Sequence, residues 1–71
     1  MAGSVYKVIE IIGTSDTSWE EAANTAVDEA ASHLEDLRVA EIVKLDMHIV
    51  DNKVAAYRAR VSVSFKYHKD A

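Results

Sequence analysis

The sequence contains no cysteine, no proline and only two glycines, and each of these shortages excludes something. Without cysteine there can be no disulfide, no iron–sulfur cluster and no zinc site built on cysteine ligands. The three histidines are spread along the sequence and form no close pair of the kind found in metal-site motifs. With so few chain-breaking residues, we expect a small number of long elements joined by short connections.

Charge and hydropathy exclude further classes of protein. The 12 acidic and 8 basic residues give a net charge of −4, which is unlike the basic surface of a nucleic-acid-binding protein. No apolar run is long enough to span a membrane, and the first residues do not resemble a signal peptide. We therefore expect a cytoplasmic protein whose partners are neither nucleic acids nor membranes.

A chain of 71 residues is expected to form one domain over 1–71. Such a short chain buries only about 60% of the surface that its unfolded form exposes, so a lone monomer would be marginally stable. Small domains usually gain stability from disulfides, a metal or partner subunits. With disulfides excluded, the sequence favours association with further copies of itself, and a cation held by carboxylates is the lesser alternative.

The first half of the chain predicts a strand followed by a helix. The β-branched residues of 5–12 indicate a strand buried on both faces, and 13–16 have the composition of a turn. A helix is predicted over 18–36, because Thr17 or Ser18 can cap it with a glutamate three residues later. One face of this helix is apolar and consists of Trp19, Ala23, Ala26, Val27, Ala30 and Leu34.

The second half predicts a hairpin, because apolar and polar residues alternate on both sides of a turn at 51–53. In the first of these strands, one face carries Val43, Leu45, Met47 and Ile49, and the other carries Lys44, Asp46 and His48. A three-residue loop would pair Asp46 with Arg58 and Met47 with Tyr57. The fold class is therefore α+β, with the order β-α-β-β and a three-stranded antiparallel sheet packed on one helix.

A single alanine-rich helix is too small to cover the whole apolar face of such a long hairpin. The last strand could extend over roughly 46 Å, at about 3.3 Å for each residue. The helix would cover only roughly 28 Å, at about 1.5 Å for each residue. We expect the far end of the last strand to remain uncovered and to contact another subunit, through Val61, Val63, Phe65 and Tyr67.

No catalytic motif is present: the sequence has no nucleophile elbow, no phosphate-binding loop and no dinucleotide fingerprint. His48 beside Asp46 could take part in acid–base chemistry, but a strand face of mixed charge is more often solvated or in contact with another subunit. Trp19 could stack on a ligand or could anchor the start of the helix on the sheet. The sequence therefore favours a protein that is not an enzyme.

Charged residues nevertheless suggest two kinds of ligand. Three carboxylates could supply hard oxygen ligands for a cation such as calcium: Asp46, Glu20 and Asp16. Three cationic side chains could bind phosphate or another anion: Lys44, Arg58 and Arg60. An ion pair between Asp46 and Arg58 competes with the first interpretation, and an ion network between subunits competes with the second.

The sequence resembles the dodecins in four stretches: VYKVIEIIGTS at the start, SWEEA at the start of the helix, RVAEIV, and YRARVSVSF near the end. The resemblance extends over 5–65. It implies a β-α-β-β chain whose sheet wraps one helix, and a hollow homododecamer as the assembled form. It also implies a protein that binds and stores a small ligand without catalysis.

The resemblance further implies a ligand site at Val39, Lys44, Asp46 and Arg58. In dodecins that bind flavin, a tryptophan at the position of Val39 stacks on the ring, and a glutamine at the position of Arg58 bonds the ring edge. Valine has no π face, and arginine offers only donors. A flavin such as FMN or riboflavin is therefore a possible cofactor whose site is weakened by these two residues.

One branch of the family lacks that tryptophan and shares the SWE, RVA and DM sequences of this chain. Its members are associated with calcium, so the resemblance implies calcium as a possible ligand and Asp46 with Glu20 as candidate metal ligands. Other members bind coenzyme A at subunit junctions, which the basic residues here would permit. Two alternatives stay open: a flavin-sequestering dodecin with a variant site, and a structural or interaction oligomer without a ligand.

Overall fold

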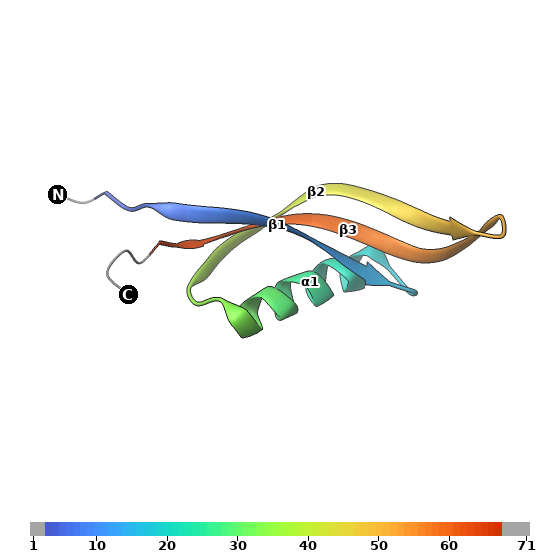
Figure 1. The fold of residues 1–71 in the computed structure, drawn as a ribbon, viewed down its shortest axis with the longest axis horizontal. Coiled ribbons are helices and arrows are strands. Elements are labelled where there is room, and N and C mark those ends of the chain that lie inside the picture. The colour runs from blue at the N-terminus through green and yellow to red at the C-terminus, as the bar shows by residue number, and fades with distance from the viewer. Residues whose placement is uncertain (1–2, 68–71) are drawn as a thin grey trace.

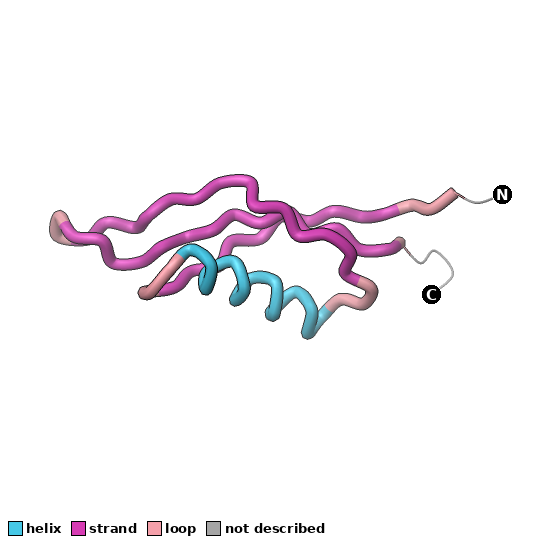
Figure 2. The backbone as a smooth tube through the Cα atoms, turned by 180° about the vertical axis from the view of Figure 1, so that it is seen from behind, coloured by secondary structure: helices cyan, strands magenta, loops and turns pink. Residues whose placement is uncertain are grey.

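The computed structural model describes residues 3–67. The chain forms β1 (Tyr6–Ser15), α1 (Trp19–His33), β2 (Leu37–Val50) and β3 (Lys53–Lys66). The strands make one antiparallel sheet in the order β1-β3-β2, so β3 is the central strand (Figure 1). Helix α1 packs on one face of the sheet and leaves the other face uncovered (Figure 2). The predicted α+β class and the β-α-β-β order are confirmed.

The core lies between α1 and the central strand. Its buried residues are Ala22, Ala26, Ala30, Ala59, Val61 and Val63. The expectation that Val61 and Val63 would stay uncovered is wrong: they are 0% and 1% exposed, because α1 lies over this part of β3. Side chains alternate along a strand, so Arg58, Arg60, Ser62 and Ser64 point away from the helix. We call this side of the sheet the outer face.

Uncovered apolar surface lies on β2, at the end of the hairpin, and at the opposite end of the sheet, where Tyr67 is exposed as expected. About half of each of these side chains is exposed: Ile42, Val43, Leu45, Met47, Ile49, Val50 and Val54. Helix α1 stops short of the hairpin tip, which projects past it (Figure 1). The predicted burial of 5–12 on both faces is also wrong. Val8 and Ile12 are 58% and 48% exposed, because nothing in residues 3–67 covers the outer face.

Strand β1 continues beyond its predicted end at residue 12, because 13–15 pair with β3 instead of forming a turn. Gly13 makes this possible by letting the helix approach closely. A Cβ atom at Gly13 would lie 2.0 Å from the backbone oxygen of Ala22 and 2.9 Å from the Cβ of Ala26. The apolar stripe of α1 is therefore centred on Ala22, Ala26 and Ala30, of which Ala22 was not predicted from the sequence.

Ser18 caps α1, which was one of the two predicted possibilities. Its Oγ accepts a hydrogen bond of 3.0 Å from the backbone N–H of Glu21. The helix ends at His33, earlier than the predicted residue 36, because Leu34 has an extended backbone and Asp36 has a φ of 59° that turns the chain into β2. No helix in the described part of the chain is long and apolar enough to cross a membrane.

The hairpin turn contains two residues rather than the predicted three. Asp51 and Asn52 both have positive φ, at 52° and 66°, which is the geometry of a tight hairpin turn. An irregularity between His48 and Ile49 then shifts the pairing by one residue. The two differences compensate, so the predicted pairs Asp46–Arg58 and Met47–Tyr57 are confirmed.

Candidate ligand and cation site

Asp46 and Arg58 form a bidentate ion pair on the outer face. The Nε of Arg58 donates to Asp46 Oδ1 at 2.7 Å, and a terminal guanidinium nitrogen donates to Oδ2 at 2.9 Å. The two residues are cross-strand partners, so the hairpin register places them together. The hydrogen bonds from Arg58 are the main reason why the pKa of Asp46 is lowered. The sequence allowed either a cation ligand or an ion pair at Asp46. The structure has the ion pair, and both carboxylate oxygens of Asp46 accept hydrogen bonds from Arg58.

Lys44 and Arg60 lie next to this pair on the same face. They are direct cross-strand partners of each other, and Arg60 also pairs with Ile12 of β1. The positive charges of Arg60 and Lys44 help to lower the pKa of Asp46 further, after the contribution of Arg58. Three of the four expected ligand-site residues, Lys44, Asp46 and Arg58, are thus brought together in one polar cluster.

Val39, the fourth residue, is not part of that cluster. It pairs with Ser64 of β3, whose Oγ donates a hydrogen bond of 3.4 Å to the Val39 backbone oxygen. Ser64 and Arg58 are six positions apart on β3, which corresponds to roughly 20 Å at about 3.3 Å for each residue. The side chain of Val39 is 61% exposed. A ligand site that included both Val39 and Arg58 would therefore have to combine residues of two chains.

Trp19 anchors the start of α1 on the sheet. Its indole N–H donates a hydrogen bond of 3.0 Å to the backbone oxygen of Asp46, at the free edge of β2. Its ring meets the ring of Tyr57 edge-on, with 5.1 Å between the centroids and 70° between the planes. These contacts match the anchoring role considered for Trp19 in the sequence.

Glu20 lies on the helix side of the sheet, at a hollow beside Trp19. The hollow has a volume of about 460 Å³ and is lined by Trp19, Glu20, Ala23, Asn24, Ile42 and Leu45. Leu45 faces this hollow, so the side chain of its neighbour Asp46 points to the outer face. The two candidate metal ligands, Asp46 and Glu20, are therefore on opposite sides of the sheet. Within residues 3–67 no group of three or more histidine or carboxylate side chains is placed to hold a metal ion.

The acid–base hypothesis for His48 gains no support from its surroundings. His48 pairs with Ala56, and the carboxylate of Asp46 is held by Arg58. No hydrogen bond joins the His48 ring to Asp46 in the part of the chain that the structure describes.

Glu21 forms a polar cluster that was not predicted from the sequence. Its carboxylate accepts hydrogen bonds from the hydroxyl of Ser15, at 2.6 Å, and from the hydroxyl of Thr17. These bonds, that of Ser15 first, lower the pKa of Glu21. The capping-box spacing drew attention to Glu21, but its side chain bonds these two hydroxyls and closes the connection between β1 and α1.

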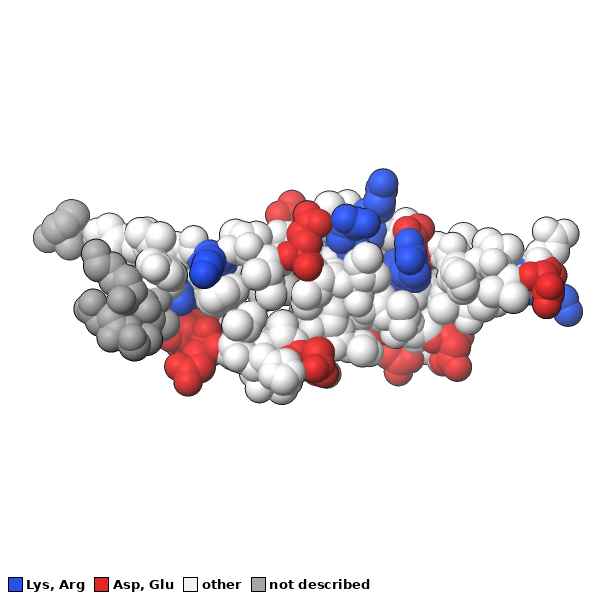
Figure 3. Space-filling model, in the orientation of Figure 1, with Lys and Arg blue, Asp and Glu red and all other residues white. Residues whose placement is uncertain are grey.

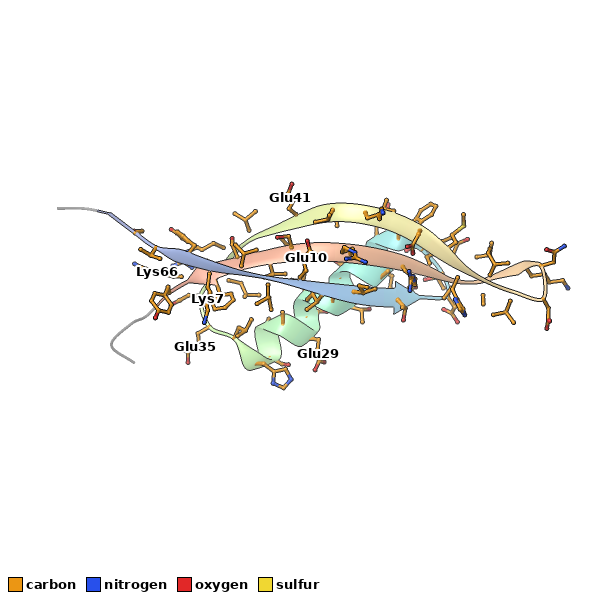
Figure 4. All side chains as sticks on the ribbon, turned by 45° about the horizontal axis from the view of Figure 1, so that its top comes forward. Lys7, Glu10, Glu29, Glu35, Glu41 and Lys66 are labelled. Atoms are coloured by element: carbon orange, nitrogen blue, oxygen red, sulfur yellow. The ribbon has the colours of Figure 1, made fainter. Side chains whose placement is uncertain are left out.

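Two further carboxylates on the outer face were also missed. Glu10 and Glu41 flank Ser62, one from β1 and the other from β2. Figure 4 shows both on the side of the sheet away from the helix, whereas Glu29 lies on the helix. In Figure 3, acidic and basic side chains lie side by side over the sheet, while acidic ones follow the helix. The alternation of β3 places Ser62 on this face. Glu10 could not be placed beside it, because the pairing of β1 with β3 was not predicted.

A second hollow of about 300 Å³ lies at the other end of the molecule. It is lined by Lys7, His33, Leu34, Glu35, Phe65, Lys66 and Tyr67. The ammonium group of Lys7 lies 5.6 Å from the centre of the Tyr67 ring. Figure 4 shows Lys7 directed toward the end of the helix, where Glu35 lies. This hollow is far from the Asp46–Arg58 pair and shares no residue with it.

Comparison with known proteins gives a consistent result. The dodecin family model matches residues 5–68. Calcium dodecin of Mycobacterium tuberculosis is 51% identical over 63 residues, which are 89% of each chain. A crystal structure of that calcium-chelating antigen, which has a calcium-binding site, superposes with a TM-score of 0.83 and 48% identity, over 96% of this chain and 97% of the other. Dodecin from Streptomyces coelicolor superposes with a TM-score of 0.88 and 28% identity, over 96% of this chain and 97% of the other. This chain belongs to the dodecin family.

Proposed function

We propose that this chain is a non-enzymatic binding and storage protein that assembles with copies of itself, as a dodecamer, and holds calcium in preference to flavin. The observation that carries the proposal is its 51% identity to a calcium dodecin over most of both chains. The chemistry of Val39 and Arg58, the positions that flavin would need, supports the same choice of ligand.

Two features argue against tight flavin binding. Val39 offers no aromatic face, so the stacking contribution of roughly 0.5–1.5 kcal/mol for each aromatic pair would be absent. Arg58 carries only hydrogen-bond donors, and two of them are engaged by Asp46. A carboxamide at the same position could both donate to a flavin ring and accept from it.

Calcium is the ligand whose chemistry suits the carboxylates of this chain, because it takes six to eight oxygen ligands from several groups. Asp46 and Glu20 are our proposed ligands. They lie on opposite sides of one sheet, so a calcium ion that used either residue would have to complete its oxygen shell from another copy or from water. At Asp46 the ion would also have to displace Arg58.

Native mass spectrometry of the purified protein, together with melting in the presence of calcium or chelator, tests this function. We expect an assembly of twelve chains and a melting temperature that rises with calcium, because an ion that binds only the folded state stabilises it. The rise should be reduced in Asp46→Asn and in Glu20→Gln. Asp28→Asn, at an exposed acidic residue of α1, is the matched control and should respond like the wild type.

Other outcomes would point to the alternatives. An unchanged melting temperature in saturating calcium would contradict the calcium proposal and favour a structural oligomer without a ligand. Quenching of riboflavin fluorescence at nanomolar protein would favour a flavin-sequestering dodecin with a variant site. In our proposal, strong quenching is expected only when Val39→Trp and Arg58→Gln restore the flavin positions.

A further inference from the structure

The hollow beside Trp19 lies between the start of α1 and β2, on the helix side of the sheet. Its volume of about 460 Å³ falls within the roughly 300–1,000 Å³ of small-molecule sites. It exists because the buried stripe of α1 packs on β1 and β3, so that the helix contacts β2 least. The pairing of β2 also skips Val43, which brings Ile42 and Leu45 to the same side of the strand.

The walls of this hollow are apolar and already in position. Ile42 and Leu45 are each about half exposed there. The ring of Trp19 is fixed by its hydrogen bond to Asp46 and by its edge-on contact with Tyr57. A ligand that meets a preformed wall loses less affinity to the ordering of side chains. The apolar body of a small molecule could therefore remove this surface from water at low cost.

Two polar side chains border the hollow on the side of the helix. Glu20 and Asn24 are four residues apart, so they are neighbours on one face of α1. Neither side chain takes part in an ion pair or a side-chain hydrogen bond within residues 3–67. None of the described residues that line the hollow carries a positive charge. A carboxylate accepts hydrogen bonds and a carboxamide both accepts and donates them, so this border suits a cationic donor.

We propose that the hollow binds a small organic cation, with its ammonium group at Glu20 and Asn24 and its apolar body against Trp19, Ile42 and Leu45. An anionic ligand would meet the carboxylate of Glu20 without a cationic side chain to compensate. A bare metal ion would leave the apolar walls in water. An ammonium group on an apolar body uses both parts of the hollow. Because Glu20 is also a proposed calcium ligand, calcium and the organic cation would compete for its carboxylate.

The fluorescence of Trp19 provides a direct test, because it is the only tryptophan of the sequence and lines the hollow. The purified protein, at neutral pH with a chelator to remove calcium, is titrated with phenethylammonium and with two probes of similar shape. Phenethyl alcohol is neutral and hydrocinnamate is anionic. We expect a saturable change in emission with phenethylammonium, a Kd about fivefold higher for the alcohol, and no saturation with the anion.

Three variants identify the groups responsible. Glu20→Gln should raise the Kd of phenethylammonium about fivefold and leave that of the alcohol unchanged. Leu45→Ala should weaken both probes by a similar factor, because it removes part of the apolar wall that both would cover. Asp28→Asn makes the same change of net charge as Glu20→Gln at an exposed residue outside the hollow, and it should bind both probes like the wild type.

Three outcomes would overturn the proposal. Equal Kd values for the three probes would mean that the hollow is a nonspecific apolar surface. An unchanged Kd of phenethylammonium in Glu20→Gln would mean that this carboxylate does not recognise the cation. No saturable change in Trp19 emission, in protein whose circular dichroism shows it to be folded, would mean that the hollow holds water or is filled by another copy of the chain.

Discussion

Asp46 links the two sides of the sheet through different atoms of one residue. Its carboxylate holds Arg58 on the outer face, while its backbone oxygen accepts the indole N–H of Trp19 from the helix side. The position of Trp19 at the start of α1 therefore depends on the same part of β2 that orients Arg58. A ligand that displaced Arg58 from Asp46 would therefore bind a residue whose backbone oxygen is hydrogen-bonded to Trp19 of the helix.

The lowered pKa of Asp46 predicts a specific dependence of stability on pH. Because the folded state favours the ionised carboxylate, the ion pair stabilises the protein fully above the pKa of the unfolded chain, which is about 4 for aspartate. That contribution is lost as the pH falls through the lower pKa of the folded state. Asp46→Asn should therefore be less stable than the wild type at pH 7, and the difference should shrink below about pH 4.

Urea unfolding at a series of pH values would measure this difference. Glu29→Gln is a suitable control because, within residues 3–67, the carboxylate of Glu29 pairs with His33 on the exposed side of the helix and not with Arg58. If Asp46→Asn and the wild type differed equally at pH 3 and pH 7, the ion pair would not be the cause of the difference.

The ion pair itself could be predicted from the sequence, whereas the partner of Arg60 could not. Asp46 and Arg58 are 12 residues apart, in a hairpin whose alternation restricts the register. Arg60 and Glu10 are 50 residues apart, and their contact depends on β1 lying beside β3. The sequence contains no local signal that β1 pairs with β3. The alternation of apolar and polar residues in β3 is equally compatible with another neighbour at that edge.

At the scale of the elements, Gly13 determines how closely β1 and α1 pack. The prediction of a turn at 13–16 followed the usual preference of glycine for turns, but the backbone at Gly13 has no positive φ. The residue is needed because α1 lies against it, with Ala22 and Ala26 as its neighbours. The small size of these two alanines allows the close approach of the helix to Gly13.

Gly13→Ala should be strongly destabilising, because its Cβ would lie 2.0 Å from a backbone oxygen that has no flexible side chain to move aside. We expect a loss of about 3 kcal/mol or more in the free energy of unfolding, at the upper end of the range for overpacked sites. Chemical denaturation would measure it. Gly3→Ala is the control, since a Cβ there meets nothing within 4 Å. Equal stability of the two variants would mean that α1 does not lie so close to β1.

A bulge, which is an extra residue in one of two paired strands, explains why the predicted alternation of β2 holds only in part. The pairing steps from Ile42 with Val61 to Lys44 with Arg60, which leaves Val43 as an extra residue. Ile42 and Leu45 therefore both line the hollow beside Trp19, although their spacing of three does not fit a regular strand. Strict alternation had placed Val43 with Leu45. Bulges have no reliable composition in a sequence, so this shift could not be predicted.

At the scale of the whole molecule, the chain is elongated. Its principal extents are 56 × 20 × 15 Å, and its radius of gyration is 14.7 Å. A compact domain of this length would have a radius of gyration of about 11 Å. The excess length comes from strands that project past both ends of α1 (Figure 1). Of the four residues of β3 and its end that were expected to stay uncovered, Val61 and Val63 are buried by α1, whereas Tyr67 is 46% exposed.

Stability of the folded chain should therefore depend on protein concentration. If copies cover the exposed apolar side chains of β2, assembly stabilises the folded state by mass action, and the melting temperature rises with concentration. Ile49, which is 52% exposed near the hairpin tip, is a suitable position for a test. Ile49→Lys should lower the melting temperature most at high concentration and weaken its dependence on concentration. Ala31→Lys, on the exposed side of α1, should preserve that dependence. A wild-type melting temperature that stayed constant over a hundredfold range of concentration would mean that the elongated monomer is stable with this surface in water.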